Sequence, residues 1–489
     1  MAIAQALLAG FLLSCAFPPF SLWWVAPIAI VCLLQSLERK PLKQRTALVA
    51  LFGASFFAPL LHWTSTYVGS IPWLLLVFGQ TLLLLPLALL PTNNYRKIIL
   101  FPALWVFIEV IRTHFPFGGF GWGRIGFSQS DSPYSQFASI AGPSGLTFIV
   151  CAISISLFFW IKQEGFLAVS SALMVALLLG ASTVAEHRIP AIVPSEHISI
   201  LAVQGGVPQL GLNFNERATA VFTNHLKVTQ EYFLRHKRNI DLIVWPENSV
   251  DVDPYSDLYV RNSLQSLVDD IHIPIIIGAV LQTPYGPQNA SILWKPQVGP
   301  TSTYIKMHLT PFGEYMPLRS VAQLLSPFAK NVVDFIPGKK AVVHIVGRAK
   351  VSPVICFELV DDQLGRSINA LGNLMLVQTN SATFGLSAES AQELEITRIR
   401  AIEHQRFAVS IATSGISAII DNEGAILQKS AQNDAEVLTY DVPLMTTRSI
   451  SDRLGNSAEI LIILVPIALY FLLPFLEWKL RRIKRRSCQ

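Results

Sequence analysis

Charged residues are scarce in this chain. Asp, Glu, Lys and Arg make up 14% of its 489 residues, and 52% of the residues are hydrophobic. Soluble globular proteins carry about 25% charged residues. The stretches 1–37 and 46–91 contain none of these four residue types. This composition excludes an ordinary soluble domain of this length and predicts a membrane protein with a soluble insert.

Cysteine is also scarce, with five residues in the whole chain. Three lie in apolar runs and Cys488 lies in the basic tail, so Cys356 is the sole thiol of the polar block 186–455. A disulfide scaffold is therefore excluded for this block, and Cys356 is either buried and inert or kept for chemistry. His and Cys residues do not cluster with ligand spacing, so we expect no metal site and no cofactor.

The apolar runs predict eight membrane spans. The stretches 1–37 and 46–91 each hold two, and single spans are expected at roughly 98–113, 140–161, 166–185 and 460–476. These runs approach the roughly 17–25 residues that a helix needs to cross the hydrocarbon. Lys and Arg follow spans 2, 4, 6 and 8, which predicts a cytoplasmic location for both termini.

The chain thus divides into three predicted parts. Residues 1–185 form a seven-span membrane domain, residues 186–455 form an extracytoplasmic domain, and residues 456–489 form the last span and a basic cytoplasmic tail. In the middle part, strand-length apolar runs alternate with helical stretches at 215–237 and 257–271, which predicts a layered α/β domain. The charged stretch 389–405 is predicted to be a helix with a solvated face. Strands are expected at 197–204, 240–245, 273–280, 291–295, 341–346, 351–356, 373–379, 407–412 and 416–420.

Three reactive side chains each stand at the edge of a strand-like run. Glu247 lies in Trp-Pro-Glu-Asn, Lys306 in Tyr-Ile-Lys-Met-His, and Cys356 ends the run Val-Ser-Pro-Val-Ile-Cys. A carboxylate, an ammonium group and a thiol are what acyl transfer through a thioester requires. Glu247 would act as the base, and Lys306 would favour the thiolate and stabilise an oxyanion. Each residue alone has an ordinary structural explanation, but their order and contexts together favour catalysis.

Several motifs carry a resemblance to a known family. The segments 203–209, 243–248, 304–314, 354–358 and 397–403 resemble the nitrilase superfamily. Together with the seven-plus-one arrangement of spans, the chain resembles the bacterial apolipoprotein N-acyltransferases over essentially its whole length. The resemblance implies a polytopic α-helical membrane domain with an inserted α-β-β-α sandwich, placed in the bacterial inner membrane with the sandwich facing the periplasm.

The resemblance also implies the reaction and its partners. Members of this family move an acyl chain from a phospholipid, usually phosphatidylethanolamine, to a cysteine of the enzyme. The chain then passes to the α-amino group of a lipoprotein's N-terminal diacylglyceryl-cysteine. Ping-pong kinetics follow from such a thioester. The expected partners are therefore the two lipids and the membrane, with no nucleic acid, and we expect a monomer.

Further site residues follow from the same resemblance. Glu314 is expected to orient Lys306, and Glu358 to order the site. The expected substrate-binding residues are Phe214, Phe357, Asn380, Phe384 and Gly145. The family commonly has Trp at positions 214 and 383 and Tyr at position 357, where this chain has Phe214, Thr383 and Phe357. These departures remove hydrogen-bonding or stacking groups, so they affect the predicted shape of the acyl pocket.

Two other classes of function remain open at this point. A membrane-tethered nitrilase-like amidase would use the same three residues with water as the acceptor, but a soluble substrate does not require eight spans. A non-catalytic lipid-binding or transport module would need no intact triad. The spans also lack the buried charges and broken-helix pairs that a coupled transporter requires.

Overall fold

The computed structural model describes residues 1–90, 100–188, 196–207, 214–325, 330, 332–468 and 470–471. They form two compact units. The first unit contains Met1–Leu61, Leu74–Arg188 and the chain from Leu454. The second unit contains His62–Trp73 and Ile189–Arg453. Residues 62–73 belong to the second unit, and the predicted domain boundaries at 185 and 455 stay predictions.

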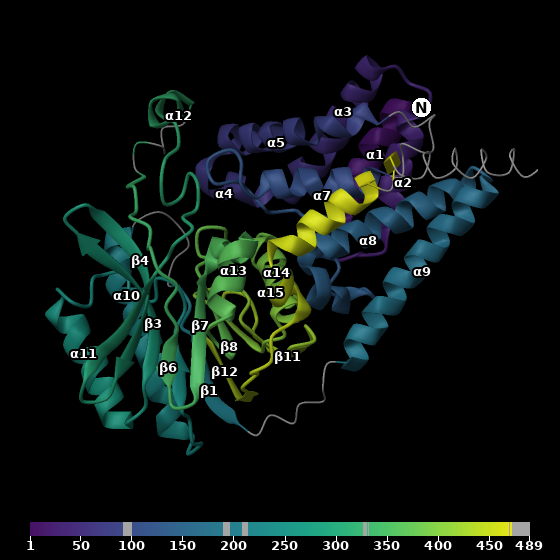
Figure 1. The fold of residues 1–489 in the computed structure, drawn as a ribbon. Coiled ribbons are helices and arrows are strands. Elements are labelled where there is room, and N and C mark those ends of the chain that lie inside the picture. Colours follow the sequence, from purple (N-terminus) through teal and green to yellow (C-terminus); the bar gives the residue numbers. More distant parts are fainter. Residues whose placement is uncertain are drawn as a thin grey trace, which may run out of the picture. The chain divides into compact units, whose positions relative to one another are not determined.

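The first unit is helical. Close packing of its helices is visible at Gly10 of α1, where a Cβ atom would lie 2.2 Å from the Phe52 carbonyl oxygen of α3. A larger residue at position 10 would separate these two helices. The helices lie where apolar runs predicted them (Figure 1): α1 (Ala2–Cys15), α2 (Val25–Leu37), α3 (Leu42–Leu60), α5 (Ser70–Leu84), α7 (Phe101–Arg112), α8 (Ala138–Ile161) and α9 (Gly165–Arg188).

Two helical stretches among the described residues are both long and apolar enough to cross a membrane. They are Ser70–Leu89 and Ser135–Ile161, with mean hydropathies of 1.9 and 2.1. Shorter apolar helices occur at Ala2–Cys15, Val25–Leu37, Leu167–Gly180 and Asn456–Ala468. The membrane character is therefore supported, while the count of eight spans stays a prediction.

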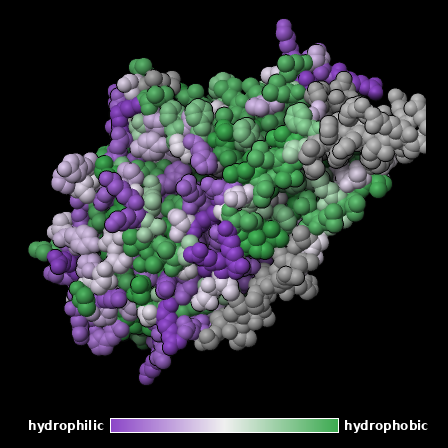
Figure 2. Space-filling view, viewed as in Figure 1, coloured by the Kyte–Doolittle hydropathy of each residue, from purple (hydrophilic) through white to green (hydrophobic). Residues whose placement is uncertain are grey.

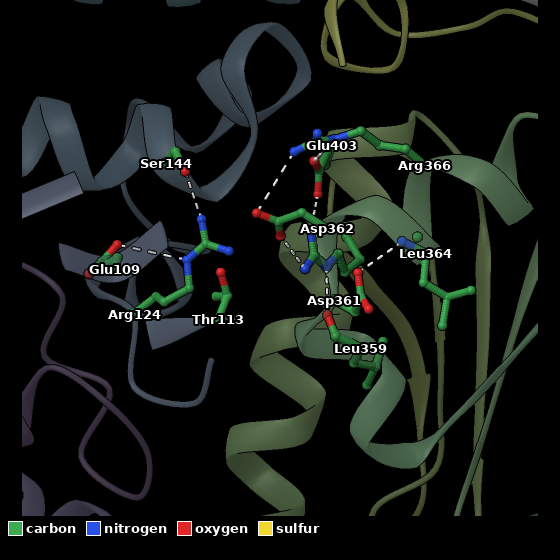
Figure 3. Close-up of polar contacts among 12 residues, drawn as sticks. Glu109, Thr113, Arg124, Ser144, Leu359, Asp361, Asp362, Leu364, Arg366 and Glu403 are labelled. Atoms are coloured by element: carbon green, nitrogen blue, oxygen red, sulfur yellow. Dashed lines mark hydrogen bonds and ion pairs between the residues drawn. The ribbon is translucent and has the colours of Figure 1, made fainter. Parts of the chain in front are cut away.

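A buried polar cluster holds the segment after α7 inside the first unit. Glu109 accepts a hydrogen bond from the Ile125 backbone N–H at 2.8 Å, and its Oε2 lies 3.8 Å from Arg124 Nε (Figure 3). Arg124 in turn donates to Ser144 at 2.7 Å. The expectation that the spans lack buried charges is wrong for the predicted span 98–113, where Glu109 and Arg112 are buried and Arg112 donates to the carbonyl oxygen of Trp122 at 2.7 Å. A helical spacing of three cannot reveal a partner that arrives from a loop.

The second unit contains two six-stranded sheets. The first has the order β12-β1-β2-β3-β4-β5 and the second has the order β11-β10-β9-β8-β7-β6. The strands are β1 (His197–Gln204), β2 (Leu242–Val244), β3 (Ile275–Thr283), β4 (Gly286–Lys295), β5 (Gly299–Ile305), β6 (His344–Val346), β7 (Ala349–Ile355), β8 (Leu374–Thr379), β9 (Ala408–Ala412), β10 (Ala418–Ile420), β11 (Ile426–Lys429) and β12 (Glu436–Pro443).

Side chains alternate between the two faces of each sheet, as strand geometry requires. Ile200 and Ala202 of β1 share a core with Leu376 of β8 and Val409 of β9, so the sheets pack face to face. Leu201 and Val203 point the other way, into a second core. That core includes residues of α10 (Phe214–Arg235) and α11 (Leu258–Ile271).

Helices cover the outer face of the second sheet as well. Leu364 and Ile368 of α13 (Asp362–Asn369) pack with Ile355 of β7, and α14 (Glu389–His404) lies beside β9. The short helices α12 (Arg319–Leu325) and α15 (Ile450–Leu454) complete the unit. The layers confirm the predicted α-β-β-α sandwich. Each predicted strand overlaps an observed strand, but β5, β11 and β12 were not predicted.

Candidate active site

Glu247 follows β2, at the carboxyl end of the central strands of the first sheet. Its side chain is buried, and its Oε1 accepts a hydrogen bond from Asn289 Nδ2 at 2.6 Å. The turn at Glu247 presses against β3, where a Cβ atom on Gly278 would lie 2.6 Å from Glu247 Cα. Gly278 therefore permits the close backbone approach that sets the carboxylate in place.

Lys306 follows β5, which runs in the same direction as β3 because β4 is antiparallel to both. Its ammonium group is buried between two carboxylates, 2.9 Å from Glu314 Oε2 and 3.4 Å from Glu247 Oε1. Burial alone would lower the pKa of Lys306, but Glu314 and Glu247 outweigh it and hold that pKa well above its ordinary value. The side chain is thus a fixed positive charge at neutral pH.

Glu314 and Asn289 complete this arrangement. Asn289 Nδ2 donates to Glu314 Oε1 at 2.9 Å as well as to Glu247, and the Thr310 backbone N–H donates to Glu314 Oε2 at 2.8 Å. Burial opposes ionisation of Glu314, but Lys306 and these donors hold its pKa below the ordinary value. For Glu247 the balance is different, because burial outweighs the charge of Lys306 and raises its pKa. A carboxylate with a raised pKa is suited to accept a proton.

Cys356 comes directly after β7 and has a φ of +49°. A residue with a side chain adopts this left-handed conformation only where the surroundings enforce it, and such strain is common at functional sites. Burial and the carboxylate of Glu247 raise the pKa of the Cys356 thiol well above its ordinary value, against the effect of Lys306. The resting group is therefore a thiol. Lys306 lowers the pKa of this thiol, as the sequence predicts, but burial and the nearby carboxylates outweigh its effect.

Glu358 ties the Cys356 turn to the segment that carries Lys306. One carboxylate oxygen accepts hydrogen bonds from the Tyr304 hydroxyl at 2.7 Å and the Met307 backbone N–H at 2.6 Å. The other accepts from the Ile355 backbone N–H at 2.8 Å. These contacts join the ends of β5 and β7, so Glu358 positions two reactive groups without facing the solvent.

The helix α14 is buried, which corrects the prediction of a solvated face. Arg400 donates from Nη2 to Asp362 at 2.6 Å and from Nε to the Leu359 carbonyl oxygen at 2.7 Å, and it also pairs with Glu403. Figure 3 shows Asp362, Leu359 and Glu403 gathered around this point. The charged side chains of α14 that were predicted to face solvent pair with groups of other elements instead. One of those elements is the turn that begins at Cys356.

Two carboxyl groups on α14 were missed by the sequence reasoning. Glu389 and Glu393 are 2% and 3% exposed. The Cys356 thiol and the Thr379 hydroxyl lie within reach of Glu393 as hydrogen-bond donors. Burial raises the pKa of Glu389 to about 8 and that of Glu393 well above its ordinary value. The sequence feature that could have revealed these two residues is their i,i+4 spacing, which places both on one helix face, opposite the face that carries Glu395.

The predicted substrate-binding residues are placed in different surroundings. The Phe357 ring is buried and meets His308 edge-on, with the ring centroids 5.4 Å apart. Asn380 and Thr383 line a small cavity together with Asn248 and Thr413. The Phe384 ring packs against Trp63, with centroids 4.9 Å apart.

The two other predicted substrate-binding residues are not part of this cavity as described. Gly145 lies in α8 of the first unit, where a Cβ atom would lie 2.6 Å from the Cβ atom of Ala141. Its small size therefore leaves room for Ala141 and the Phe137 ring beside the kink in α8. The side chain of Phe214 lies outside the part of the chain that the structure describes.

Comparison with known proteins gives matches over both units. The family model for the apolipoprotein N-acyltransferase N-terminal domain matches residues 9–156, and the carbon-nitrogen hydrolase model matches residues 202–452. An amidase structure from Nesterenkonia sp. is 16% identical, with a TM-score of 0.39, and the match covers 52% of this chain and 93% of that one.

Several full-length relatives are apolipoprotein N-acyltransferases. The protein of Mycolicibacterium smegmatis is 30% identical over 99% of this chain and 87% of its own length. The protein of Shewanella oneidensis is 28% identical over 90% of both chains. The protein of Haemophilus influenzae is 26% identical over 97% of this chain and 95% of its own length. The chain therefore belongs to the apolipoprotein N-acyltransferase family, whose acyltransferase domain has the nitrilase fold.

Proposed function

We propose that this enzyme transfers a fatty acyl chain from a phospholipid, through a thioester on Cys356, to the α-amino group of an apolipoprotein's diacylglyceryl-cysteine. One observation carries the proposal: Glu247, Lys306 and Cys356 leave three different strands and interact in one buried site. The family supplies the lipoprotein acceptor. The donor, with phosphatidylethanolamine as the first candidate, is our assignment.

The first half-reaction begins from a neutral thiol. Glu247, 3.4 Å from Lys306, accepts the thiol proton as the sulfur attacks the ester carbonyl carbon. The negative charge that forms on the carbonyl oxygen is stabilised by the buried ammonium of Lys306, an effect worth about 3 kcal/mol for a single well-placed donor. Glu247 then returns its proton to the departing glycerol oxygen, leaving an acyl-cysteine and a lysophospholipid.

The second half-reaction joins the acyl group to nitrogen. A neutral amine attacks the thioester carbonyl and a C–N bond forms. As the C–S bond breaks, Glu247 carries one proton from the nitrogen to the departing sulfur. Lys306 again faces the oxygen that becomes negative, because the same carbonyl occupies the same position. The acyl chain would lie against Phe357, Asn380 and Phe384, with Phe214 and Gly145 as further candidates.

The membrane arrangement completes the proposal. Residues 1–185 would form seven spans, residues 186–455 would face the periplasm, and residues 456–489 would return to the cytoplasm, in a monomer held in the inner membrane. Large apolar side chains exposed on the first unit support this arrangement (Figure 2). They include Leu8, Phe11, Leu74, Phe78, Trp160, Leu173 and Leu177, each at least half exposed.

Intact-protein mass spectrometry tests the acyl-enzyme. We would incubate purified wild type and Cys356→Ala with vesicles of phosphatidylethanolamine. The wild type should gain one fatty-acyl mass that hydroxylamine removes, and Cys356→Ala should gain none. Discharge by a diacylated lipopeptide with a free α-amine, but slow loss in water, identifies a transferase. An adduct on Cys356→Ala, or rapid hydrolysis of the wild-type adduct, would contradict the proposal.

A further inference from the structure

The three-residue mechanism leaves two buried carboxyl groups unused. Glu389 and Glu393 lie one helical turn apart on α14, and each is at least 97% buried. Both interact electrostatically with Glu247, and both contribute to raising the pKa of the Cys356 thiol. They are therefore part of the surroundings of the nucleophile, although they follow neither β2, β5 nor β7.

These carboxyl groups have oxygen atoms that no described group satisfies. Glu389 Oε2 and Glu393 Oε1 are buried and lack a hydrogen-bond partner among the described residues. The amide oxygen of Asn289 is also buried without a hydrogen-bond partner among the described residues, whereas its amide nitrogen donates to Glu247 and Glu314. All three atoms are acceptors. Buried acceptors are normally paired, so this set indicates a ligand that brings N–H or O–H donors.

The charge of the site indicates that the hydrogen-bond donor of this ligand is a cation. Glu247 and Glu314 pair with the buried ammonium of Lys306. Glu389 and Glu393 interact electrostatically with Glu247. Two carboxyl groups thus have no opposite charge in the described part of the site. A buried carboxylate without a cation is unfavourable. Glu389 and Glu393 therefore ionise readily only when a positively charged group enters the site.

We infer that Glu389 and Glu393 form the subsite that binds the α-ammonium group of the acceptor and takes a proton from it. This inference rests on the proposed function, since it assigns the second substrate of that reaction. A primary ammonium fits because it offers three N–H donors and one positive charge. Glu393 is the closer acceptor to the chemistry, because it contacts the sulfur that carries the acyl group.

The proton balance of this step closes. The entering ammonium displaces one proton from the carboxyl pair to solvent, and Glu393 then takes a proton from the bound nitrogen. The lone pair so exposed attacks the thioester carbonyl, forming the C–N bond. Glu247 removes the second nitrogen proton and delivers it to the sulfur as the C–S bond breaks. The products are an amide, the free thiol and one proton in solvent, and the carboxyl pair regains its starting state.

The two half-reactions allow a test that separates this inference from the proposed function. Wild type, Glu389→Gln and Glu393→Gln would be acylated with phosphatidylethanolamine and then discharged with either a diacylated lipopeptide or hydroxylamine. Discharge by the lipopeptide, relative to acyl-enzyme formation, should fall at least tenfold in both variants. Discharge by hydroxylamine, which is uncharged at neutral pH, should fall much less. Glu395→Gln is the matched control, because Glu395 lies on the same helix and pairs with Arg398 at 3.0 Å.

Each outcome bears on one claim. Absence of an acyl-enzyme in wild type overturns the proposed function. A wild-type acyl-enzyme with equal lipopeptide discharge in Glu389→Gln and Glu393→Gln overturns only the ammonium subsite. A second measurement needs no change on α14: Cys356→Ala should bind the amine lipopeptide at least tenfold more tightly than an analogue with hydroxyl in place of the α-amine. Equal binding of the two lipopeptides also overturns the subsite.

Discussion

At the scale of single residues, Glu314 adds to the effect of burial on the pKa of Glu247. The negative charge of Glu314 raises the pKa of Glu247, and Glu314 also holds Lys306 at 2.9 Å. Because the proposed mechanism uses deprotonated Glu247 as the base, acylation should be lost as the pH falls through its raised pKa. In Glu314→Gln that pKa decreases, so the acid limb of the pH–rate profile should move to lower pH. The maximal rate should fall about tenfold because Lys306 is less well fixed.

The measurement is the rate of acyl-enzyme formation across pH. Glu231→Gln makes the same chemical change on an exposed face of α10, where Glu231 pairs only with Lys227 and Arg235 in the described contacts. Its profile should match wild type. An acid limb that stays in place or moves to higher pH in Glu314→Gln would contradict this account of Glu247.

The residues of the site could be predicted only where local context revealed them. Glu247 and Cys356 follow apolar strands, and Lys306 stands in the motif Tyr-Ile-Lys-Met-His, so the sequence singled out all three. Glu389 and Glu393 lie in a helix with mixed charges, and that pattern is typical of a solvated surface. Their burial depends on Arg400, which pairs with a neighbouring helix, and on the distant Cys356. No local pattern records such long-range pairing.

At the scale of elements, an ion-pair cluster attaches α14 to the turn after Cys356. Arg400 is 2% exposed and binds Asp362, Glu403 and the Leu359 carbonyl. Arg400→Met would leave buried carboxylates without their main partner, so unfolding should become easier by about 3 kcal/mol. Acylation should also slow, since the Cys356 turn loses an anchor.

Thermal unfolding of the detergent-solubilised protein measures this effect. Arg348→Met is the matched control, because Arg348 is 77% exposed and pairs with Glu196 at the surface. Exposed pairs contribute at most about 1 kcal/mol, so this control should shift the transition little. Equal shifts for the two variants would show that the cluster around Arg400 does not stabilise the fold.

The missed strands share one physical property. β5, β11 and β12 are edge strands of their sheets, and their residues are partly exposed. A half-exposed strand carries no continuous apolar run, which was the signal that identified the central strands. In β5 the sequence Gly-Pro-Thr-Ser-Thr-Tyr-Ile also resembles a loop. The layers could therefore be predicted from the buried strands, whereas the sheet edges depended on tertiary pairing.

At the scale of the whole molecule, the proposed topology predicts which loops a reagent can reach. Tyr285 joins β3 to β4 and is 87% exposed, and the topology places it in the periplasm. Gln163 lies between α8 and α9, beside the Lys162 that indicates a cytoplasmic loop. With Cys356→Ala and Cys488→Ser as the background, a membrane-impermeant thiol reagent should label Tyr285→Cys in intact spheroplasts. Gln163→Cys should react only after the membrane is opened.

The labelling also tests the span count, because each added or missing span moves the residues that follow it to the opposite side of the membrane. If an even number of spans precedes residue 163, the N-terminus and the loop at Gln163 lie on the same side of the membrane. One further span then places the domain 186–455 on the opposite side. If Gln163→Cys and Tyr285→Cys react together in intact spheroplasts, the span between them is absent and the catalytic domain shares a side with the loop. If Tyr285→Cys alone reacts, Cys356 must meet its phospholipid in the outer leaflet. The acyl donor is then drawn from the lipids of that leaflet, which would make leaflet composition a determinant of the chain transferred.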